Sequence, residues 1–109
     1  MTLSEKVPCP LVHIAELLKS ASEHQRWKAY PEAERLWLEA LEFGREQLGP
    51  DHPAVGTALA DLGQGLVEQG RPLEGREYLI QALTNLEKNL GNSDPQVLWI
   101  FSHLHELFR

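Results

Sequence analysis

Leu48-Gly49-Pro50-Asp51-His52-Pro53 lies near the middle of this 109-residue chain. The same pattern of leucine, glycine and proline recurs in Leu90-Gly91-Asn92-Ser93-Asp94-Pro95. The leucine, the glycine and the last proline of the two stretches each lie 42 residues apart. A fixed period between roughly 20 and 50 residues is typical of an array of stacked structural repeats. Such arrays present surfaces more often than reaction centres, so the spacing predicts a binding module.

The composition fits one soluble globular domain. Hydrophobic residues make up 42% and charged residues 24% of the chain, and the net charge is −6. No apolar run reaches the roughly 18 residues of a membrane span, the N-terminus lacks an apolar signal core, and the single Cys9 cannot form an internal disulfide. We therefore expect a cytoplasmic protein. Its acidity, without a Lys/Arg cluster, disfavours nucleic acid and anionic membranes and favours a basic or apolar peptide surface.

Apolar residues recur at three- and four-residue spacing in five segments, which predicts five helices and no strand. The expected ranges are 11–27, 31–48, 53–69, 73–90 and 95–108, after a flexible lead-in over 1–9. On the first helix the expected buried face is Leu11, Ile14, Leu17, Leu18 and Ala21. A single domain over 10–108 would then hold repeat one (11–48), repeat two (53–90) and a terminal helix (95–108).

The two repeats agree in side-chain size when they are aligned at the 42-residue offset. Large residues coincide at Leu17, Leu59 and Phe101 and at Trp37 and Leu79; small residues coincide at Ala21 and Gly63, Ala33 and Gly75, and Ala40 and Ala82. Two antiparallel helices approach closely only where bulk on one helix meets a small residue on the other. The pattern therefore predicts that Ala21 lies close to Ala33 and that Gly63 lies close to Gly75.

These spacings resemble the tetratricopeptide repeat. The matching positions are Leu17, Ala21, Ala33, Trp37 and Ala40 in repeat one, and Leu59, Leu62, Gly63, Leu66, Gly75, Leu79 and Ala82 in repeat two. The 42-residue period and the Leu-Gly-x-x-His-Pro junction over 48–53 are similar to the longer repeats of kinesin light chains. The resemblance implies an all-α, right-handed superhelix of two helix pairs plus a C-terminal helix. It also implies an interaction module or adaptor, without importing a particular cellular role.

The expected third helix departs from the family pattern by three internal glycines. Gly63 has a packing role opposite Gly75, whereas the sequence offers none for Gly56 and Gly65. An internal glycine costs a helix about 1 kcal/mol relative to alanine. We therefore expect this helix to be the softer one in the array, that is, less stable than the other helices.

The resemblance further implies a concave inner wall, lined by the first helix of each pair. The residues expected to bind a partner there are Lys19, Ser22, Arg26, Asp61, Gln64, Glu68, Trp99, His103 and Glu106. Asp61 stands where kinesin-light-chain-like repeats often carry Asn, so it would accept from peptide N–H groups or bind a cation, and it could not donate. The alternative interpretation is that these residues form an ordinary solvated face.

The last helix carries more apolar side chains than one buried stripe requires. Residues 97–101 read Val-Leu-Trp-Ile-Phe, and further apolar residues follow to 108. A terminal helix of a repeat array is normally polar on its outer side, and surplus apolar surface marks an interaction site. We expect a homodimer that forms through Leu98, Trp99, Phe101 and Phe108. Docking onto another protein, or tighter folding of the helix onto its own chain, are the alternatives.

Little in the chain indicates chemistry at a reaction centre. His103 and His105 lie two residues apart and so point to different sides of a helix, and the chain has no HExxH or paired CxxC motif. Cys9 has no visible base beside it. We expect no catalytic residue, metal or cofactor. Two other functions stay open: a sensor that closes on a small molecule or peptide signal, and a purely structural oligomerisation element.

Overall fold

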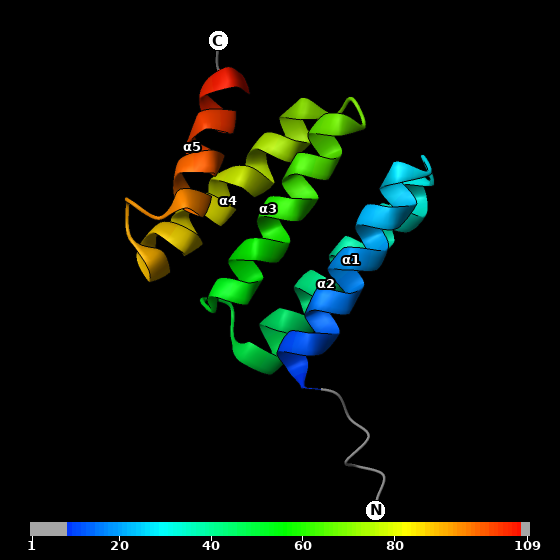
Figure 1. Ribbon diagram of the computed structural model, residues 1–109, viewed down its shortest axis with the longest axis horizontal. Coiled ribbons are helices and arrows are strands. Elements are labelled where there is room, and N and C mark those ends of the chain that lie inside the picture. The colour runs from blue at the N-terminus through cyan, green and yellow to red at the C-terminus, as the bar shows by residue number, and fades with distance from the viewer. Residues whose placement is uncertain (1–8, 108–109) are drawn as a thin grey trace, which may run out of the picture.

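The computed structural model describes residues 9–107, which form five α-helices joined by short turns (Figure 1). The helices are α1 (Pro10–Arg26), α2 (Tyr30–Leu48), α3 (Pro53–Glu68), α4 (Pro72–Leu90) and α5 (Pro95–Leu107). No strand occurs within this part of the chain. The predicted all-α fold is confirmed. Residues 1–8 of the expected lead-in over 1–9, and Phe108 of the expected dimer interface, lie outside the described residues.

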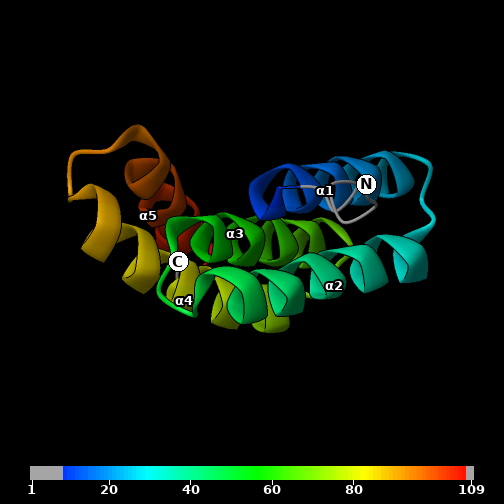
Figure 2. The ribbon, with the colours of Figure 1, turned by 90° about the horizontal axis from the view of Figure 1, so that it is seen from below.

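The helices are arranged in two layers. α1 packs against α2, α3 packs against α4, and α5 lies against α4. Seen along the plane of the layers, α1, α3 and α5 occupy one side and α2 and α4 the other (Figure 2). The first helix of each pair therefore contributes to one common face, as the repeat pattern predicts.

Prolines and glycines set the helix boundaries. A proline occupies the first or second position of every helix, where its missing N–H costs no intrahelical hydrogen bond. Gly49 and Gly91 follow α2 and α4 with φ of 94° and 90°, a region that favours glycine. His52 caps α3, because its Nδ1 accepts the N–H of Ala54 at 3.0 Å. His52 therefore helps to shape the turn between the two repeats.

The hydrophobic core continues from one repeat into the next. Its fully buried large side chains include Leu62, Leu66, Leu79, Leu86 and Ile100. Burying one side chain of this size stabilises the fold by about 1.5–3 kcal/mol. The prediction for Leu11 was wrong, since this residue is 49% exposed. It lies in the first turn of α1, whose packed neighbours are α2 and α3, and neither covers that turn fully.

The predicted close approach of Gly63 and Gly75 is confirmed. A methyl group on Gly63 would lie 2.8 Å from the carbonyl oxygen of Gly75, and one on Gly75 would lie 2.5 Å from that of Gly63. Both distances are too short for a real carbon–oxygen contact, so the backbones of α3 and α4 meet directly here. In repeat one, Ala21 and Ala33 are fully buried in the same core.

Gly56 and Gly65 also have packing roles, so the premise for a softer α3 was wrong. A methyl group on Gly65 would collide with the ring of Trp37, and one on Gly56 would collide with the side chain of Asn85. Trp37 thereby reaches from α2 to α3, and Asn85 Nδ2 donates to the carbonyl oxygen of His52 at 3.1 Å. The glycines make room for side chains that tie neighbouring elements together.

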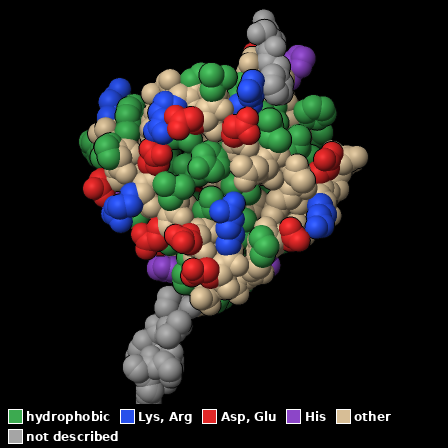
Figure 3. Space-filling model, turned by 180° about the vertical axis from the view of Figure 1, so that it is seen from behind, with side chains coloured by type: hydrophobic (Ala, Val, Ile, Leu, Met, Phe, Trp, Pro, Cys, Tyr) green, Lys and Arg blue, Asp and Glu red, His purple; other side chains and the backbone are tan. Residues whose placement is uncertain are grey.

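The face formed by α2 and α4 carries interspersed acidic and basic side chains around scattered hydrophobic ones (Figure 3). Arg35 pairs with Glu32 at 2.8 Å within α2, and Lys88 of α4 pairs with Asp51 at 3.3 Å. Exposed pairs of this kind contribute little to stability, about 0–1 kcal/mol each. Because charges of both signs alternate, this face has the character of a solvated outer surface.

Candidate functional site: a groove between the two repeats

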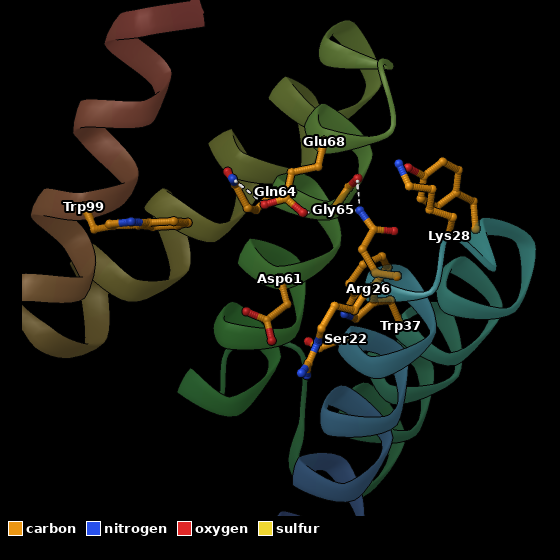
Figure 4. Close-up of a pocket in the computed structure, with 11 residues that line it drawn as sticks. Ser22, Arg26, Lys28, Trp37, Asp61, Gln64, Gly65, Glu68 and Trp99 are labelled. Atoms are coloured by element: carbon orange, nitrogen blue, oxygen red, sulfur yellow. Dashed lines mark hydrogen bonds between the residues drawn. The ribbon is translucent and has the colours of Figure 1, made fainter.

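A groove opens on the face that α1, α3 and α5 share (Figure 4). Its volume is about 510 Å³. Its lining consists of Ser22, Gln25, Arg26, Lys28, Tyr30, Trp37, Asp61, Gln64, Gly65, Glu68 and Trp99. Most of these residues belong to α1 with its following turn and to α3, and α5 contributes Trp99. The groove therefore follows the joint between the two repeats.

Six of the nine residues predicted for the inner wall line this groove: Ser22, Arg26, Asp61, Gln64, Glu68 and Trp99. The other three lie outside the lining. Lys19 is exposed on α1, and Glu106 is exposed on α5. His103 stands beside Trp99 with ring centroids 4.0 Å apart, and its Nδ1 donates to the Trp99 carbonyl oxygen at 3.1 Å. The groove is shorter than the predicted wall and stops at Trp99 on its α5 side.

Five of the lining residues had no predicted role in binding: Gln25, Lys28, Tyr30, Trp37 and Gly65. Trp37 is only 3% exposed and was expected in the core, yet its ring reaches the groove because Gly65 has no side chain to block it. A signal for this existed in the sequence. Gly65 is an internal helix glycine, two residues after Gly63, with no role evident from its own repeat. Trp37 is larger than Leu79, which occupies the equivalent position in the other repeat.

One end of the groove is closed by hydrogen bonds between α1 and the end of α3. Gln25 Nε2 donates to the carbonyl oxygen of Gly65 at 3.0 Å, and Gln69 Nε2 donates to Gln25 Oε1 at 3.0 Å. On α3 itself, Gln64 Nε2 donates to Glu68 Oε2 at 3.1 Å. These contacts hold the two repeats at a defined separation, so the groove has a preformed width.

Arg71 adds a second cross-link between the repeats. Its Nη1 lies 2.7 Å from Glu34 Oε1 on α2, and its Nε lies 2.6 Å from Glu74 Oε1 on α4. Hydrogen bonds to the two carboxylates raise the pKa of Arg71, and the Arg71 guanidinium lowers the pKa of Glu74. Because Arg71 stands in the turn between α3 and α4, it ties repeat two to α2.

Asp61 is the acidic lining residue whose carboxylate is largely buried and has no partner within residues 9–107. No other residue of 9–107 forms a hydrogen bond or ion pair with its carboxylate. Burial raises the pKa of Asp61 to about 6, since desolvation disfavours the charged form. One turn further along α3, Gln64 Oε1 is buried without a donor in the described part of the chain. The α3 side of the groove thus holds hydrogen-bond acceptors whose capacity is unused.

Charge is divided between the two sides of the groove. Arg26 and Lys28 come from α1 and its turn, whereas Asp61 and Glu68 come from α3 (Figure 4). Burial is the cause of the raised pKa of Asp61, and neither Arg26 nor Lys28 forms an ion pair with its carboxylate within residues 9–107. An occupant of the groove would therefore meet positive groups along α1 and negative groups along α3.

A separate apolar patch lies on α5, formed by Leu98, Phe101, Ser102 and His105. Leu98 is 51% and Phe101 61% exposed. The predicted self-association residues are thus divided: Leu98 and Phe101 lie in this α5 patch, and Trp99 faces the groove.

Two further properties concern the described residues as a whole. Between residues 9 and 107, no group of three or more His, Cys, Asp or Glu side chains is arranged to hold a metal ion. None of the five helices combines the length and the apolar character that crossing a membrane requires.

Antiparallel helix pairs that repeat along the chain, with a groove on the side of their first helices, define a helical-repeat protein of the interaction type. The family model described as tetratricopeptide repeat matches residues 13–88, which is more than half of the chain. The chain therefore belongs to the tetratricopeptide repeat family, whose domains generally act as protein–protein interaction modules. A comparison with curated proteins gives no match.

Proposed function

We propose that this protein is an adaptor that binds a partner polypeptide in the groove between its two repeats. The observation that carries the proposal is the preformed groove itself, which has polar groups of both signs and an aromatic wall. Pockets of about 300–1,000 Å³ with a few placed polar groups are typical of binding sites. A groove of about 510 Å³ accommodates a few residues of a peptide, so we expect a weak, transient interaction for the isolated chain.

The remaining features of the proposal follow from charge and composition. A net charge of −6 without a basic cluster favours a protein partner over nucleic acid or an anionic membrane. We propose a non-enzymatic, cofactor-free role in the cytoplasm, where a lone thiol such as that of Cys9 stays reduced. The 42-residue period and the His52-Pro53 junction support a kinship with kinesin-light-chain-like repeats.

Selection from a display library of random dodecapeptides tests the proposal. Ser22 is exposed at the groove, so Ser22→Tyr should fill the groove with little effect on the fold. We expect the wild-type chain to enrich a family of peptides, and the Ser22→Tyr variant to bind them at least about tenfold more weakly, which corresponds to about 1.4 kcal/mol.

Gln47→Tyr is the matched control, because Gln47 is exposed on α2, away from the groove. Circular dichroism verifies that both variants are folded. Equal binding by the Ser22→Tyr variant and the wild type would show that peptides bind elsewhere. Enrichment of no peptide at all would favour a small-molecule sensor or a structural element instead.

We also propose that the protein self-associates through the α5 patch. Leu98 and Phe101 are large apolar side chains that are more than half exposed on adjacent turns of one helix. Removing such side chains from water gains about 25 cal/mol per Å² of apolar surface. A second copy offers the same patch, and an interface between identical patches closes as a two-fold dimer.

A further inference from the structure

We propose that the groove binds a cationic side chain of its partner, arginine or lysine, with Asp61 as the anion that holds it and Trp99 as the flanking ring. This inference rests on the proposed function, and it specifies the chemistry of the partner. Arginine and lysine side chains are hydrogen-bond donors only, whereas an ionised Asp is an acceptor only.

The first reason is the isolation of Asp61. Its carboxylate is largely removed from water, and no other described residue donates to it or pairs with it. A buried charge without a partner is costly, and its removal from water is offset only by an opposite charge and hydrogen bonds. A guanidinium or ammonium group supplies both, whereas a neutral amide donor supplies only the hydrogen bond.

The second reason is the unused acceptor that neighbours it. Gln64 lies one helical turn beyond Asp61 on the same face of α3, and its Oε1 has no donor within residues 9–107. Rotation of the Gln64 side chain would present this oxygen to the same ligand group. A guanidinium has five N–H donors, so it can satisfy Asp61 and Gln64 together.

The third reason is the aromatic ring on the facing wall. Trp99 extends from α5 toward the side of the groove that holds Asp61 and Gln64, and its indole ring points there with its edge (Figure 4). His103 lies against Trp99 with ring centroids 4.0 Å apart and ring planes tilted by 37°, so the indole is packed on one side. The face of a Trp ring attracts cations, and arginine most often.

The charged groups around Asp61 determine the expected pH dependence. Arg26 faces the groove from α1, Lys28 from the following turn and Glu68 from α3, while His103 lies behind Trp99 on α5. Burial raises the pKa of Asp61 to about 6. Since a cation binds the ionised carboxylate, affinity should rise as the pH increases through this value. Near pH 5 about one tenth of Asp61 is ionised, so binding should be up to about tenfold weaker than near pH 7.5.

The test uses the peptides selected by the full-length protein. The basic residue most enriched in them is replaced by a neutral analogue: citrulline for arginine or acetyl-lysine for lysine. Calorimetry then measures each peptide pair against the wild type, Asp61→Asn, and Asp51→Asn. The last variant is the matched control, since it makes the same charge change at an exposed position away from the groove.

We expect neutralisation of the ligand to weaken wild-type binding by at least about tenfold, which corresponds to about 1.4 kcal/mol. The same neutralisation should weaken binding to Asp61→Asn by less than about twofold, and Asp51→Asn should behave like the wild type. The pH dependence through about 6 should disappear in Asp61→Asn and persist in Asp51→Asn. Both variants retain His103, so a pH dependence that is lost only in Asp61→Asn is due to Asp61.

Two results would overturn the inference in distinguishable ways. Selection of acidic or neutral peptides would refute the cation site and leave the peptide groove intact. The same holds if the ratio of the affinities for the arginine and citrulline peptides is equal in Asp61→Asn and the wild type. If Ser22→Tyr does not affect binding, the groove is not the peptide site, and the cation inference fails together with the proposed function.

Discussion

The helices α3 and α5 occupy equivalent places, each following a Gly-containing junction and each beginning at a proline, yet they differ in how they are covered. α3 lies between repeat one and α4 and is buried along most of its length. α5 packs on α4 and leaves Leu98 and Phe101 exposed. The same kind of helix is thus a core element in one position and a surface element in the other.

The residues at equivalent positions account for this difference. Gly56 and Gly63 of α3, which contact α4, correspond 42 residues later to Leu98 and His105 of α5. A glycine lets a second helix approach until backbones touch, whereas His105 would hold a helix further away. The small residues of a repeat therefore predict a packing contact only where a neighbouring helix lies against them.

The largest expected effect comes from Gly63→Leu. The first carbon of the new side chain would already lie 2.8 Å from both the Gly75 carbonyl oxygen and Leu79. We expect the free energy of unfolding to fall by at least about 3 kcal/mol, because the backbone of α4 must move. His105→Leu at the equivalent position of α5 should change it by about 0.5 kcal/mol or less.

Urea denaturation of dilute samples, followed by circular dichroism, measures both variants. Similar losses in Gly63→Leu and His105→Leu would contradict the proposed distinction between a closely packed and an open helix.

An intermediate effect, of opposite sign, is expected for Asp61→Asn. The pKa of Asp61 is about 6 in the folded state and 3.8 in its ordinary state. Between these values the folded protein binds a proton that the unfolded chain has lost, so stability falls as the pH rises through this window. Near pH 7.5 the full penalty is present, and Asp61→Asn should raise the free energy of unfolding by about 1–3 kcal/mol.

The gain should vanish near pH 4, where the folded wild type is protonated. Glu46→Gln, at an exposed acid of α2, should change stability by less than about 0.5 kcal/mol at either pH. Thermal melts across the pH range measure these differences. A destabilised Asp61→Asn variant near pH 7.5 would show that the carboxylate has a stabilising partner.

The smallest effect on stability, and the largest on assembly, is expected when Leu98 and Phe101 are both changed to Ser. Both side chains are more than half exposed, so the free energy of unfolding of the monomer should change by about 0.5 kcal/mol per site or less. The proposed dimer should dissociate, because its apolar contact area is lost.

Sedimentation velocity over a range of concentrations provides the measurement. The matched control changes Leu38 and Ile80, two apolar residues exposed on α2 and α4, to Ser. If the wild type stays monomeric at high concentration, or if the control dissociates equally, the chain does not self-associate specifically through the α5 patch.

The sequence predicted much of the fold, and the reasons are local. Proline at a helix start and glycine at a helix end act through the backbone of their own neighbourhood, so Pro53 and Gly91 indicated boundaries without knowledge of the fold. The repeat offset indicated the contact of Gly63 with Gly75, because two copies of one unit must solve the same packing problem.

Part of the groove could not be predicted in this way. Lys28 stands in the turn after α1 and Tyr30 begins α2, and no periodicity describes the direction of this turn. Trp37 belongs to the second helix of its repeat, and the repeat pattern assigns it to the core. Its ring reaches the groove only because Gly65 of another repeat leaves space for it. Such a contact joins residues 28 positions apart, and neither residue alone indicates the other.

By itself, the sequence determined the helices, their pairing and the family of this protein, because each depends on spacing along the chain. Only the tertiary structure decided that Asp61 is largely buried without a partner among the described residues, and that Leu98 stays half exposed on the outer side of α5. The physical reason is that solvation is a property of everything that surrounds a side chain, and the surroundings of Asp61 come from several helices at once.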